Sequence, residues 1–104
     1  MPLVIDAAGF GRDESYILQN AKYLINNDPD HKLLFSWHPW DEGQPQSRYK
    51  SAIDTAVNNR IPLLLGEISS VGALQEGTID YRYLLQYAAE KKIGWLCYLT
   101  LKIL

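Results

Sequence analysis

The sequence has almost no cysteine and no long hydrophobic run, and each absence excludes a class of protein. The single cysteine, Cys97, cannot form an internal disulfide. No stretch approaches the ~20 apolar residues of a membrane span, and residues 1–5 lack the basic and apolar regions of a secretory signal. The chain as given is therefore expected to be soluble, without a membrane partner, and its localisation stays open.

Basic charge and a phosphate-binding loop are missing as well. Lys and Arg number 10 against 12 Asp and Glu, which gives a formal net charge of -2, and the basic residues are scattered. No basic stripe is available for nucleic acid. Gly9-Phe10-Gly11 lacks the third glycine of a dinucleotide loop, so a tight turn that projects Phe10 over the sheet is the simpler interpretation. We predict no cofactor and no metal site.

Four short apolar runs are what the sequence does contain, and they recur at a constant interval. Their reference residues Ile5, Phe35, Leu65 and Leu96 lie 30, 30 and 31 residues apart, about the length of one βαβ unit. Uncharged runs of this kind are typical of strands buried on both faces. The predicted strands cover residues 2–6, 33–38, 62–67 and 94–100. Cys97, inside the last run, is expected to be a buried, unreactive thiol.

Amphipathic segments between the runs predict helices at about 14–27, 47–59 and 78–92. Asp13 or Ser15 is the expected N-cap of the first helix, and Ser47 that of the second. The inward face of the second helix is predicted to hold Tyr49, Ala52, Ile53, Ala56 and Val57. The element order is therefore βαβαβαβ.

Strict alternation of strands and helices implies a parallel sheet with right-handed crossovers. Two architectures fit: a small open sheet of flavodoxin-like order, and an arc of a (β/α)8 barrel, which needs ~250 residues when complete. The 104 residues suit a single domain, residues 1–104, of four β/α units. In both architectures functional side chains gather at the carboxyl ends of the strands.

Reactive and aromatic side chains stand at three of these strand ends. Asp6 ends the first strand, Trp37 and His38 end the second, and Trp40 comes just after it. Indole faces stack on sugar rings; alternatively, one tryptophan belongs to the core and His38 is a satisfied polar residue. Glu67 follows a leucine run, where a carboxylate is costly unless it is paired or lies at the mouth of a site. A structural salt bridge is the alternative interpretation of Glu67, and His31, away from the strand ends, is expected at the surface.

Taken together, the motifs resemble glycoside hydrolase family 5, in particular its bacterial mannanase and cellulase-like branch. Residues 2–11 resemble its fifth strand and loop, Leu34-Phe35-Ser36-Trp37-His38 the sixth strand, Leu65-Gly66-Glu67 the seventh, and Gly94-Trp95-Leu96 the start of the eighth. The shared order and spacing of the four segments make the resemblance specific. It implies the C-terminal half of a (β/α)8 TIM barrel.

The resemblance also implies residue roles in hydrolysis of O-glycosyl bonds. Glu67 matches the family's nucleophile, which forms a glycosyl-enzyme intermediate with retention, and His38 matches a substrate-side histidine. Trp40 stands where the family has a tyrosine that orients the nucleophile, and an indole N–H can donate in its place. The residues expected to contact a β-mannan or β-glucan chain are Trp40, Trp37, Phe10 and Asp6.

The family's acid/base glutamate, which ends the fourth strand, has no counterpart in this chain. Retaining hydrolysis needs a second carboxyl ~5–5.5 Å from the nucleophile. Asp6, Asp41 and Glu42 are the nearby candidates, and none matches the family's acid. We therefore expect a glycosidase-derived half-barrel with little or no activity of its own.

Half a barrel leaves two strand edges unpaired and its interior side chains uncovered. The simplest way to cover these edges and side chains is a homodimer, in which two copies either close the ring or stack their apolar faces. Two other readings remain open. One is a non-catalytic carbohydrate-binding or structural oligomeric module that keeps Trp37, Trp40 and Phe10 for stacking. The other, ranked last, is a flavodoxin-like receiver or nucleotide domain, which lacks both an acidic cluster and a phosphate loop.

Overall fold

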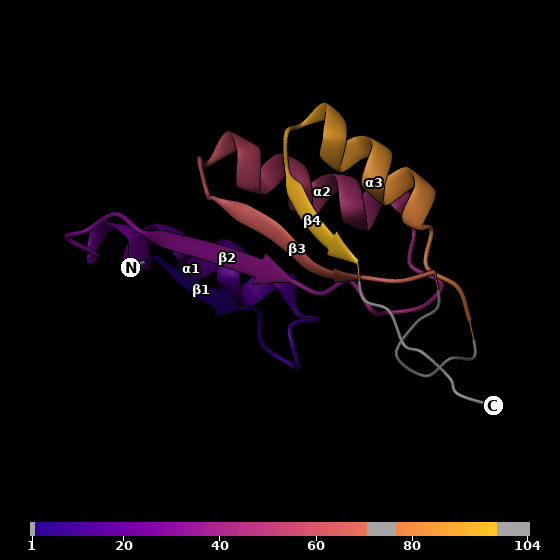
Figure 1. Ribbon diagram of the computed structural model, residues 1–104, viewed down its shortest axis with the longest axis horizontal. Helices are drawn as coiled ribbons and strands as arrows, with labels where there is room; N and C mark the ends of the chain where they lie inside the picture. Colours follow the sequence, from indigo (N-terminus) through magenta and orange to yellow (C-terminus); the bar gives the residue numbers. More distant parts are fainter. Residues whose placement is uncertain (1, 71–76, 98–104) are drawn as a thin grey trace.

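Strands and helices alternate along the whole part of the chain that the computed structural model describes, residues 2–70 and 77–97. The elements are β1 (Leu3–Asp6), α1 (Glu14–Asn26), β2 (Leu33–Trp37), α2 (Gln46–Asn58), β3 (Leu63–Ile68), α3 (Tyr81–Glu90) and β4 (Gly94–Cys97). The strands pair in parallel in the order β1-β2-β3-β4. The helices pack on one side of this sheet (Figure 1). The predicted order βαβαβαβ is confirmed.

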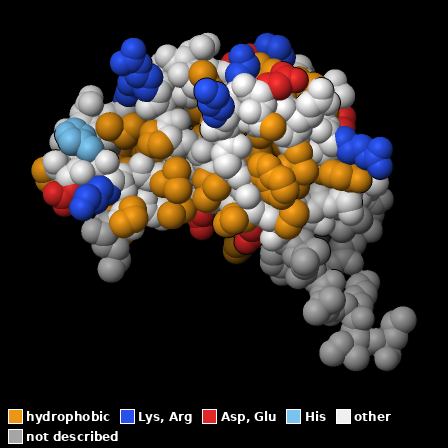
Figure 2. Space-filling model, turned by 45° about the horizontal axis from the view of Figure 1, so that its top comes forward, with side chains coloured by type: hydrophobic (Ala, Val, Ile, Leu, Met, Phe, Trp, Pro, Cys, Tyr) orange, Lys and Arg blue, Asp and Glu red, His pale blue; other side chains and the backbone are white. Residues whose placement is uncertain are grey.

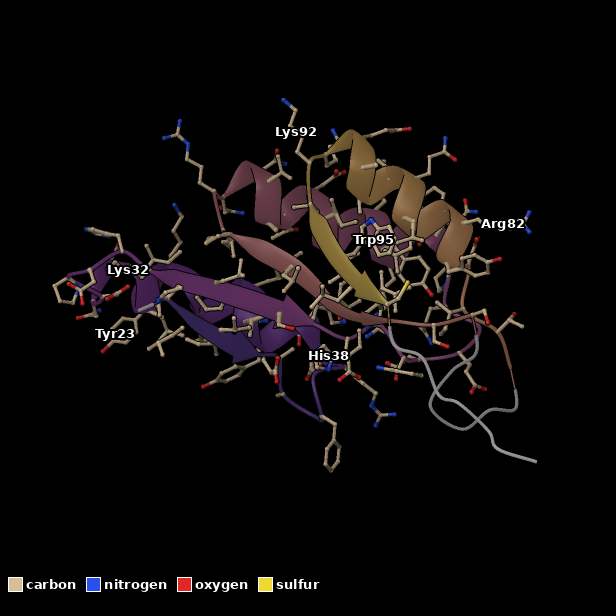
Figure 3. All side chains as sticks on the ribbon, viewed as in Figure 1. Tyr23, Lys32, His38, Arg82, Lys92 and Trp95 are labelled. Atoms are coloured by element: carbon tan, nitrogen blue, oxygen red, sulfur yellow. The ribbon has the colours of Figure 1, made fainter. Side chains whose placement is uncertain are left out.

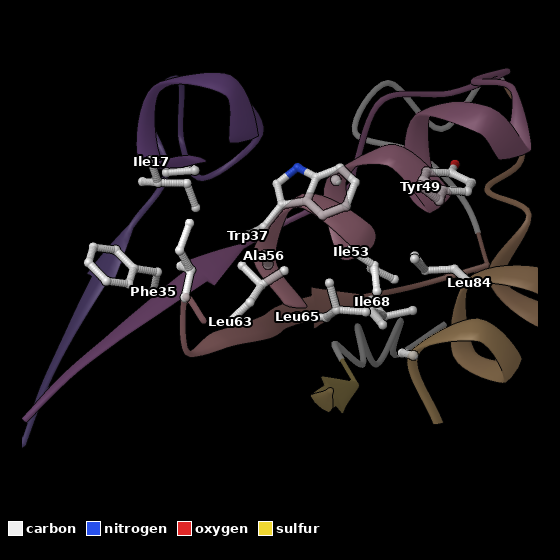
Figure 4. Close-up of a cluster of buried hydrophobic side chains, with 14 of the residues drawn as sticks. Ile17, Phe35, Trp37, Tyr49, Ile53, Ala56, Leu63, Leu65, Ile68 and Leu84 are labelled. Atoms are coloured by element: carbon white, nitrogen blue, oxygen red, sulfur yellow. The ribbon is translucent and has the colours of Figure 1, made fainter. Parts of the chain in front are cut away.

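The hydrophobic core lies between the sheet and the helices (Figure 4). Because strand side chains alternate between faces, Phe35 and Trp37 of β2 point to the same side and are both fully buried. Leu63 and Leu65 of β3 repeat this pattern. The helices contribute Ile17, Ala21, Tyr49, Ala52, Ile53, Ala56, Leu84 and Ala88. Each large apolar side chain buried here contributes about 1.5–3 kcal/mol, so this single layer stabilises the fold.

Apolar side chains on the two edge strands lie open to solvent. The exposed fractions are 58% for Leu3 and 56% for Val4 on β1, and 42% for Trp95 and 57% for Leu96 on β4. Figure 2 shows hydrophobic side chains gathered over the exposed part of the strands. The prediction of a buried Cys97 is wrong, because β4 is an edge strand and its thiol is exposed. Residues 98–100 of the predicted last strand lie outside the described residues.

The helix start agrees with the predicted one at α1 and differs from it at α2 and α3. Asp13 caps α1 and accepts a hydrogen bond from the Ser15 backbone N–H, as expected. The prediction for Ser47 is wrong, because Pro45 is the N-cap of α2 and makes no side-chain cap bond. Val57, expected on the inward face of α2, is 40% exposed. At α3 the cap is Asp80, so the helix begins at Tyr81 and not near residue 78.

Candidate active site

Three side chains meet at the carboxyl ends of β1, β2 and β3. His38 follows β2 directly (Figure 3). Its imidazole lies between the carboxylates of Asp6 and Glu67. The His38 Nε2 atom lies 3.4 Å from Asp6 Oδ1, and His38 Nδ1 lies 3.7 Å from Glu67 Oε2. The histidine side chain is 12% exposed, against 60% for Asp6 and 38% for Glu67. The carboxylates are thus the accessible members of this group.

Trp40 holds the same oxygen of Glu67. Its indole Nε1–H donates to Glu67 Oε2 at 2.9 Å, a charge-assisted hydrogen bond across the sheet top. The predicted contact between the indole and the nucleophile position is therefore present. With a tryptophan donor on one side and an imidazole on the other, Oε2 is oriented while the second oxygen, Oε1, has no hydrogen-bond partner within the described residues.

A β-bulge in β3 turns Glu67 away from the core. Leu65 pairs with Trp95 and Ile68 pairs with Cys97, so two residues of β3 stand opposite one residue of β4. Without this extra residue, Glu67 would share the face of Leu65, which is fully buried against the helices. The bulge changes the alternation, so that Ile68 is buried instead and Glu67 stays accessible. Sequence alternation alone places Glu67 on the wrong face.

Two glycines leave room for the His38 ring. A Cβ atom at Gly11 would lie 2.3 Å from His38 Nδ1, and one at Gly66 would lie 2.7 Å from His38 Nε2. The loop after β1 also contacts the histidine backbone, since the His38 N–H donates to the Gly11 carbonyl at 2.6 Å. From beneath, Ser36 Oγ lies 3.0 Å from His38 Nε2. The imidazole is therefore fixed on three sides.

Arg48 of α2 joins the loops that carry these residues, a role that the sequence analysis missed. Its guanidinium donates to both carboxylate oxygens of Glu14, at 2.9 and 2.7 Å, and to Asp41 Oδ2 at 2.9 Å. A longer bond reaches the Arg12 carbonyl at 3.3 Å. The hydrogen bonds to Glu14 and Asp41 raise the pKa of Arg48 further above its ordinary value. Asp41, a predicted candidate acid, is thus engaged in an ion pair.

Trp37 is not part of the strand-end group. Its side chain is fully buried, packs 6.2 Å from the Tyr49 ring, and donates from Nε1 to the Arg12 carbonyl at 2.9 Å. The predicted sugar-stacking role of Trp37 is therefore wrong. The alternation of side chains along β2 turns Trp37 toward the helices, where it belongs to the core. Phe10 is the opposite case: it is 94% exposed, with a φ of 60°, in the loop that follows β1.

The described residues offer neither a metal-binding group nor a membrane-spanning helix. Residues 2–70 and 77–97 contain no group of three or more His, Cys, Asp or Glu side chains placed to hold a metal ion. No helix in these ranges is both long enough and apolar enough to cross a membrane. The arrangement at the strand ends is thus a carboxylate with two nitrogen neighbours, which suits nucleophilic or acid–base chemistry.

Comparison of sequences identifies relatives that act on mannan, although no protein-family model matches the chain. The chain is 29% identical over 97 residues to a mannan endo-1,4-beta-mannosidase of Salipaludibacillus agaradhaerens, covering 92% of this chain and 31% of that protein. It is 36% identical over 77 residues to a mannan endo-1,4-beta-mannosidase of Cellvibrio japonicus, covering 65% of this chain and 16% of that protein. The chain therefore spans less than a third of these relatives.

Solved structures agree with the sequence relatives. The β-mannanase of Thermomonospora fusca matches with a TM-score of 0.80 and 27% identity, over 92% of this chain and 32% of that one. The catalytic domain of a Streptomyces sp. SirexAA-E mannanase matches with a TM-score of 0.79 and 25% identity, over 91% and 30%. The resemblance to the mannanase branch of glycoside hydrolase family 5 is confirmed, and so is the half-barrel fold of four β/α units.

Proposed function

We propose that Glu67 is the nucleophile of a retaining glycosidase site that acts on β-mannan. The observation that supports this role is the bulge in β3, which brings the Glu67 carboxylate to the strand ends, where Trp40 Nε1 donates to Oε2 at 2.9 Å. In a retaining mechanism this carboxylate attacks the anomeric carbon, the bond to the leaving oxygen breaks, and a glycosyl-enzyme forms. Water then releases the sugar with net retention.

β-Mannan is the substrate that the relatives favour. One of the similar structures is a mannohexaose complex of the Thermomonospora fusca β-mannanase, with a TM-score of 0.76 and 26% identity to this chain. On this chain, Trp40 and the exposed ring of Phe10 are the aromatic surfaces proposed for stacking on the sugar rings. Asp6, with a 60% exposed side chain, is proposed to accept hydrogen bonds from sugar hydroxyls. The proposed site thus combines stacking with polar contacts.

The acid that protonates the leaving group is proposed to lie outside this chain. Retention needs a second carboxyl about 5–5.5 Å from the first. Asp41 is paired with Arg48, and Asp6 lies on the far side of the His38 ring from Glu67. The chain spans 31% of its Salipaludibacillus relative, so a longer protein can supply the missing group. Without it, we expect hydrolysis of natural mannan by this chain to be slow or absent.

A substrate with an activated leaving group tests the nucleophile without needing the acid. In a dinitrophenyl 2-fluoromannoside, the dinitrophenolate leaves without being protonated. The glycosyl-enzyme that the fluorosugar forms is long-lived. We expect intact-mass and peptide-mass spectrometry to find this sugar on Glu67 of the wild-type chain. Glu67→Gln should remain unlabelled, while Glu90→Gln, a matched change in α3, should be labelled normally. Labelling at another residue, or in Glu67→Gln, would contradict the proposed role.

We also propose that two copies of the chain associate through the free edges of β1 and β4. Both edge strands carry apolar side chains that are about half exposed, among them Val4 at 56% and Leu96 at 57%. Unpaired edges of this kind attract another strand unless they are blocked. Light scattering should give twice the mass of the chain, and a monomer at all concentrations would contradict the homodimer.

A non-catalytic carbohydrate-binding module is the second candidate function. It is favoured by the pairing of Asp41 with Arg48, which removes one candidate acid and leaves the aromatic residues unaffected. The two candidates differ in the labelling experiment. If the chain sediments with insoluble mannan but never acquires the fluoromannosyl group, it is a binding module and not a nucleophile-bearing half-site.

A further inference from the structure

Ser36 is a buried polar residue next to the candidate site. It is 2% exposed and stands two residues before His38. Its Oγ atom lies 3.0 Å from His38 Nε2, and it has no other hydrogen-bond partner within residues 2–70 and 77–97. A buried hydroxyl without an acceptor for its proton is unfavourable. Donation from the Ser36 O–H to Nε2 gives this hydroxyl an acceptor, and it requires Nε2 to carry a lone pair.

This direction of donation determines which nitrogen of His38 carries the proton. A neutral imidazole has one N–H, so with Nε2 as acceptor the proton sits on Nδ1. That nitrogen faces Glu67 Oε2 at 3.7 Å. Asp6 favours the opposite tautomer, because its carboxylate lies 3.4 Å from Nε2 and can only accept. The Asp6 side chain is 60% exposed and solvated by water, whereas Ser36 is buried and closer.

We propose that Ser36 is a positioning residue that fixes the Nδ1–H tautomer of His38 and so directs this N–H toward Glu67. The proposal rests on the proposed function, in which Glu67 is the nucleophile. Two donors, Trp40 Nε1 and His38 Nδ1, then face the same oxygen of Glu67. The carboxylate is held in one orientation, and its other oxygen is left to attack the sugar.

The tautomer can be measured directly by NMR of ring nitrogens in the ¹⁵N-histidine-labelled chain, well above the ordinary histidine pKa of about 6.5. The chain has two histidines, and His31, which is exposed, serves as an internal reference. We expect wild-type His38 to be protonated on Nδ1. In Ser36→Ala the remaining neighbour of Nε2 is the Asp6 carboxylate, so the proton should move to Nε2. Asp6→Asn should leave it on Nδ1.

Two results would overturn the proposal: a wild-type His38 protonated on Nε2, or an unchanged tautomer in Ser36→Ala. A purely structural role of Ser36 would change the melting temperature and leave the nitrogen shifts as they are. The experiment is independent of the nucleophile test, because it needs no substrate. If the tautomer follows Ser36 but Glu67 is never labelled, the positioning holds and the proposed function fails. If the positioning also serves the reaction, Ser36→Ala should be labelled by the fluoromannoside more slowly than wild type.

Discussion

The position of the His38 ring depends on a neighbouring glycine, because a larger residue there would overlap the imidazole. Gly9 and Gly11 lie in the same loop, and both have a positive φ, +61° and +85°. A Cβ atom at Gly9 would meet nothing within 4 Å, whereas one at Gly11 would lie 2.3 Å from His38 Nδ1. Alanine at either position would therefore adopt an unfavourable left-handed backbone. Only alanine at Gly11 would also overlap the His38 ring.

We predict that Gly11→Ala destabilises the chain more than Gly9→Ala. Both substitutions should cost about 1–2 kcal/mol for the left-handed backbone. Gly11→Ala should cost a further ~1–3 kcal/mol, because the methyl group must displace the imidazole. Urea denaturation measures the difference, and NMR should show the His38 signals shifted only in Gly11→Ala. Equal losses in the two variants would contradict this account of the loop.

Asp13 gives the stability of the chain a pH dependence. The Ser15 side chain and backbone donate to the Asp13 carboxylate, and these bonds lower its pKa from the ordinary value of 3.8. Since the pKa is lower in the folded state, the stabilisation is present above pH ~4 and lost as pH falls through the lowered pKa. Asp13→Asn keeps a capping oxygen but cannot titrate in this range. We expect its melting temperature to fall less than that of wild type between pH 5 and pH ~2.5.

The control for this prediction is Asp30→Asn, which removes the same charge from an exposed position between α1 and β2. It should retain the full loss of stability in acid that the wild-type chain shows. If the melting temperatures of Asp13→Asn and Asp30→Asn fall equally as the pH is lowered, capping by Asp13 does not contribute to the acid sensitivity.

At the scale of the elements, two helices end in a conformation that usually belongs to glycine. Arg60 follows α2 with a φ of 54°, and Lys92 follows α3 with a φ of 60°. Around Lys92, the Lys92 N–H donates to the Ala89 carbonyl at 3.1 Å and the Ile93 N–H to the Ala88 carbonyl at 2.8 Å. The same pair of bonds surrounds Arg60. This pattern is a Schellman motif, in which the left-handed residue is commonly glycine.

We predict that Arg60→Gly and Lys92→Gly each stabilise the chain by about 1 kcal/mol, because glycine removes the left-handed penalty at some cost in chain entropy. Gln86→Gly is the matched control, since Gln86 is exposed inside α3, where glycine should cost about 1 kcal/mol. Urea denaturation distinguishes gain from loss. A loss in all three variants would show that the basic side chains, placed near the negative helix ends, outweigh the backbone strain.

The elements that the sequence predicted well are those whose periodicity runs without interruption. The four apolar runs and the inward face of α2 except Val57 follow directly from spacing, and the comparisons confirm the half-barrel that these elements form. What spacing could not predict is a local change of register. The bulge at Gly66 and Glu67 breaks the alternation of β3, and Pro45 starts α2 without a capping side chain. The bulge depends on the pairing of β3 with β4, and the start at Pro45 has no side-chain signal in the sequence.

The two tryptophans near the end of β2 show the same limit for the site. The sequence offered Trp37 and Trp40 as stacking residues, with one of them in the core as the alternative, and it could not say which one. Alternation assigns Trp37 to the helix-facing side of β2, where it is fully buried, while Trp40 lies beyond the strand and reaches Glu67. Arg48 was missed because its partners, Glu14 and Asp41, come from two other segments. A single arginine in a helix gives no sequence signal for such a network.

At the scale of the whole molecule, β1 and β4 are the edges of an open sheet, and the proposed homodimer would form through them. Contact between the β1 edge of one copy and the β4 edge of another is heterologous, so it either closes into a ring or continues into a filament. The curvature of a half-barrel favours closure with two copies. Light scattering distinguishes these cases, since a closed ring stays at twice the chain mass as concentration rises.

We predict that a lysine on either edge prevents the proposed association. Val4→Lys and Leu96→Lys replace side chains that are 56% and 57% exposed on β1 and β4, so neither change should disturb the core. A charge on an edge strand must be desolvated when another strand pairs with it, which disfavours the contact. Val57→Lys, at a 40% exposed position on α2, is the matched control and should remain dimeric. If the edge variants stay dimeric while keeping wild-type stability, the copies associate through another surface, such as the open faces of their sheets.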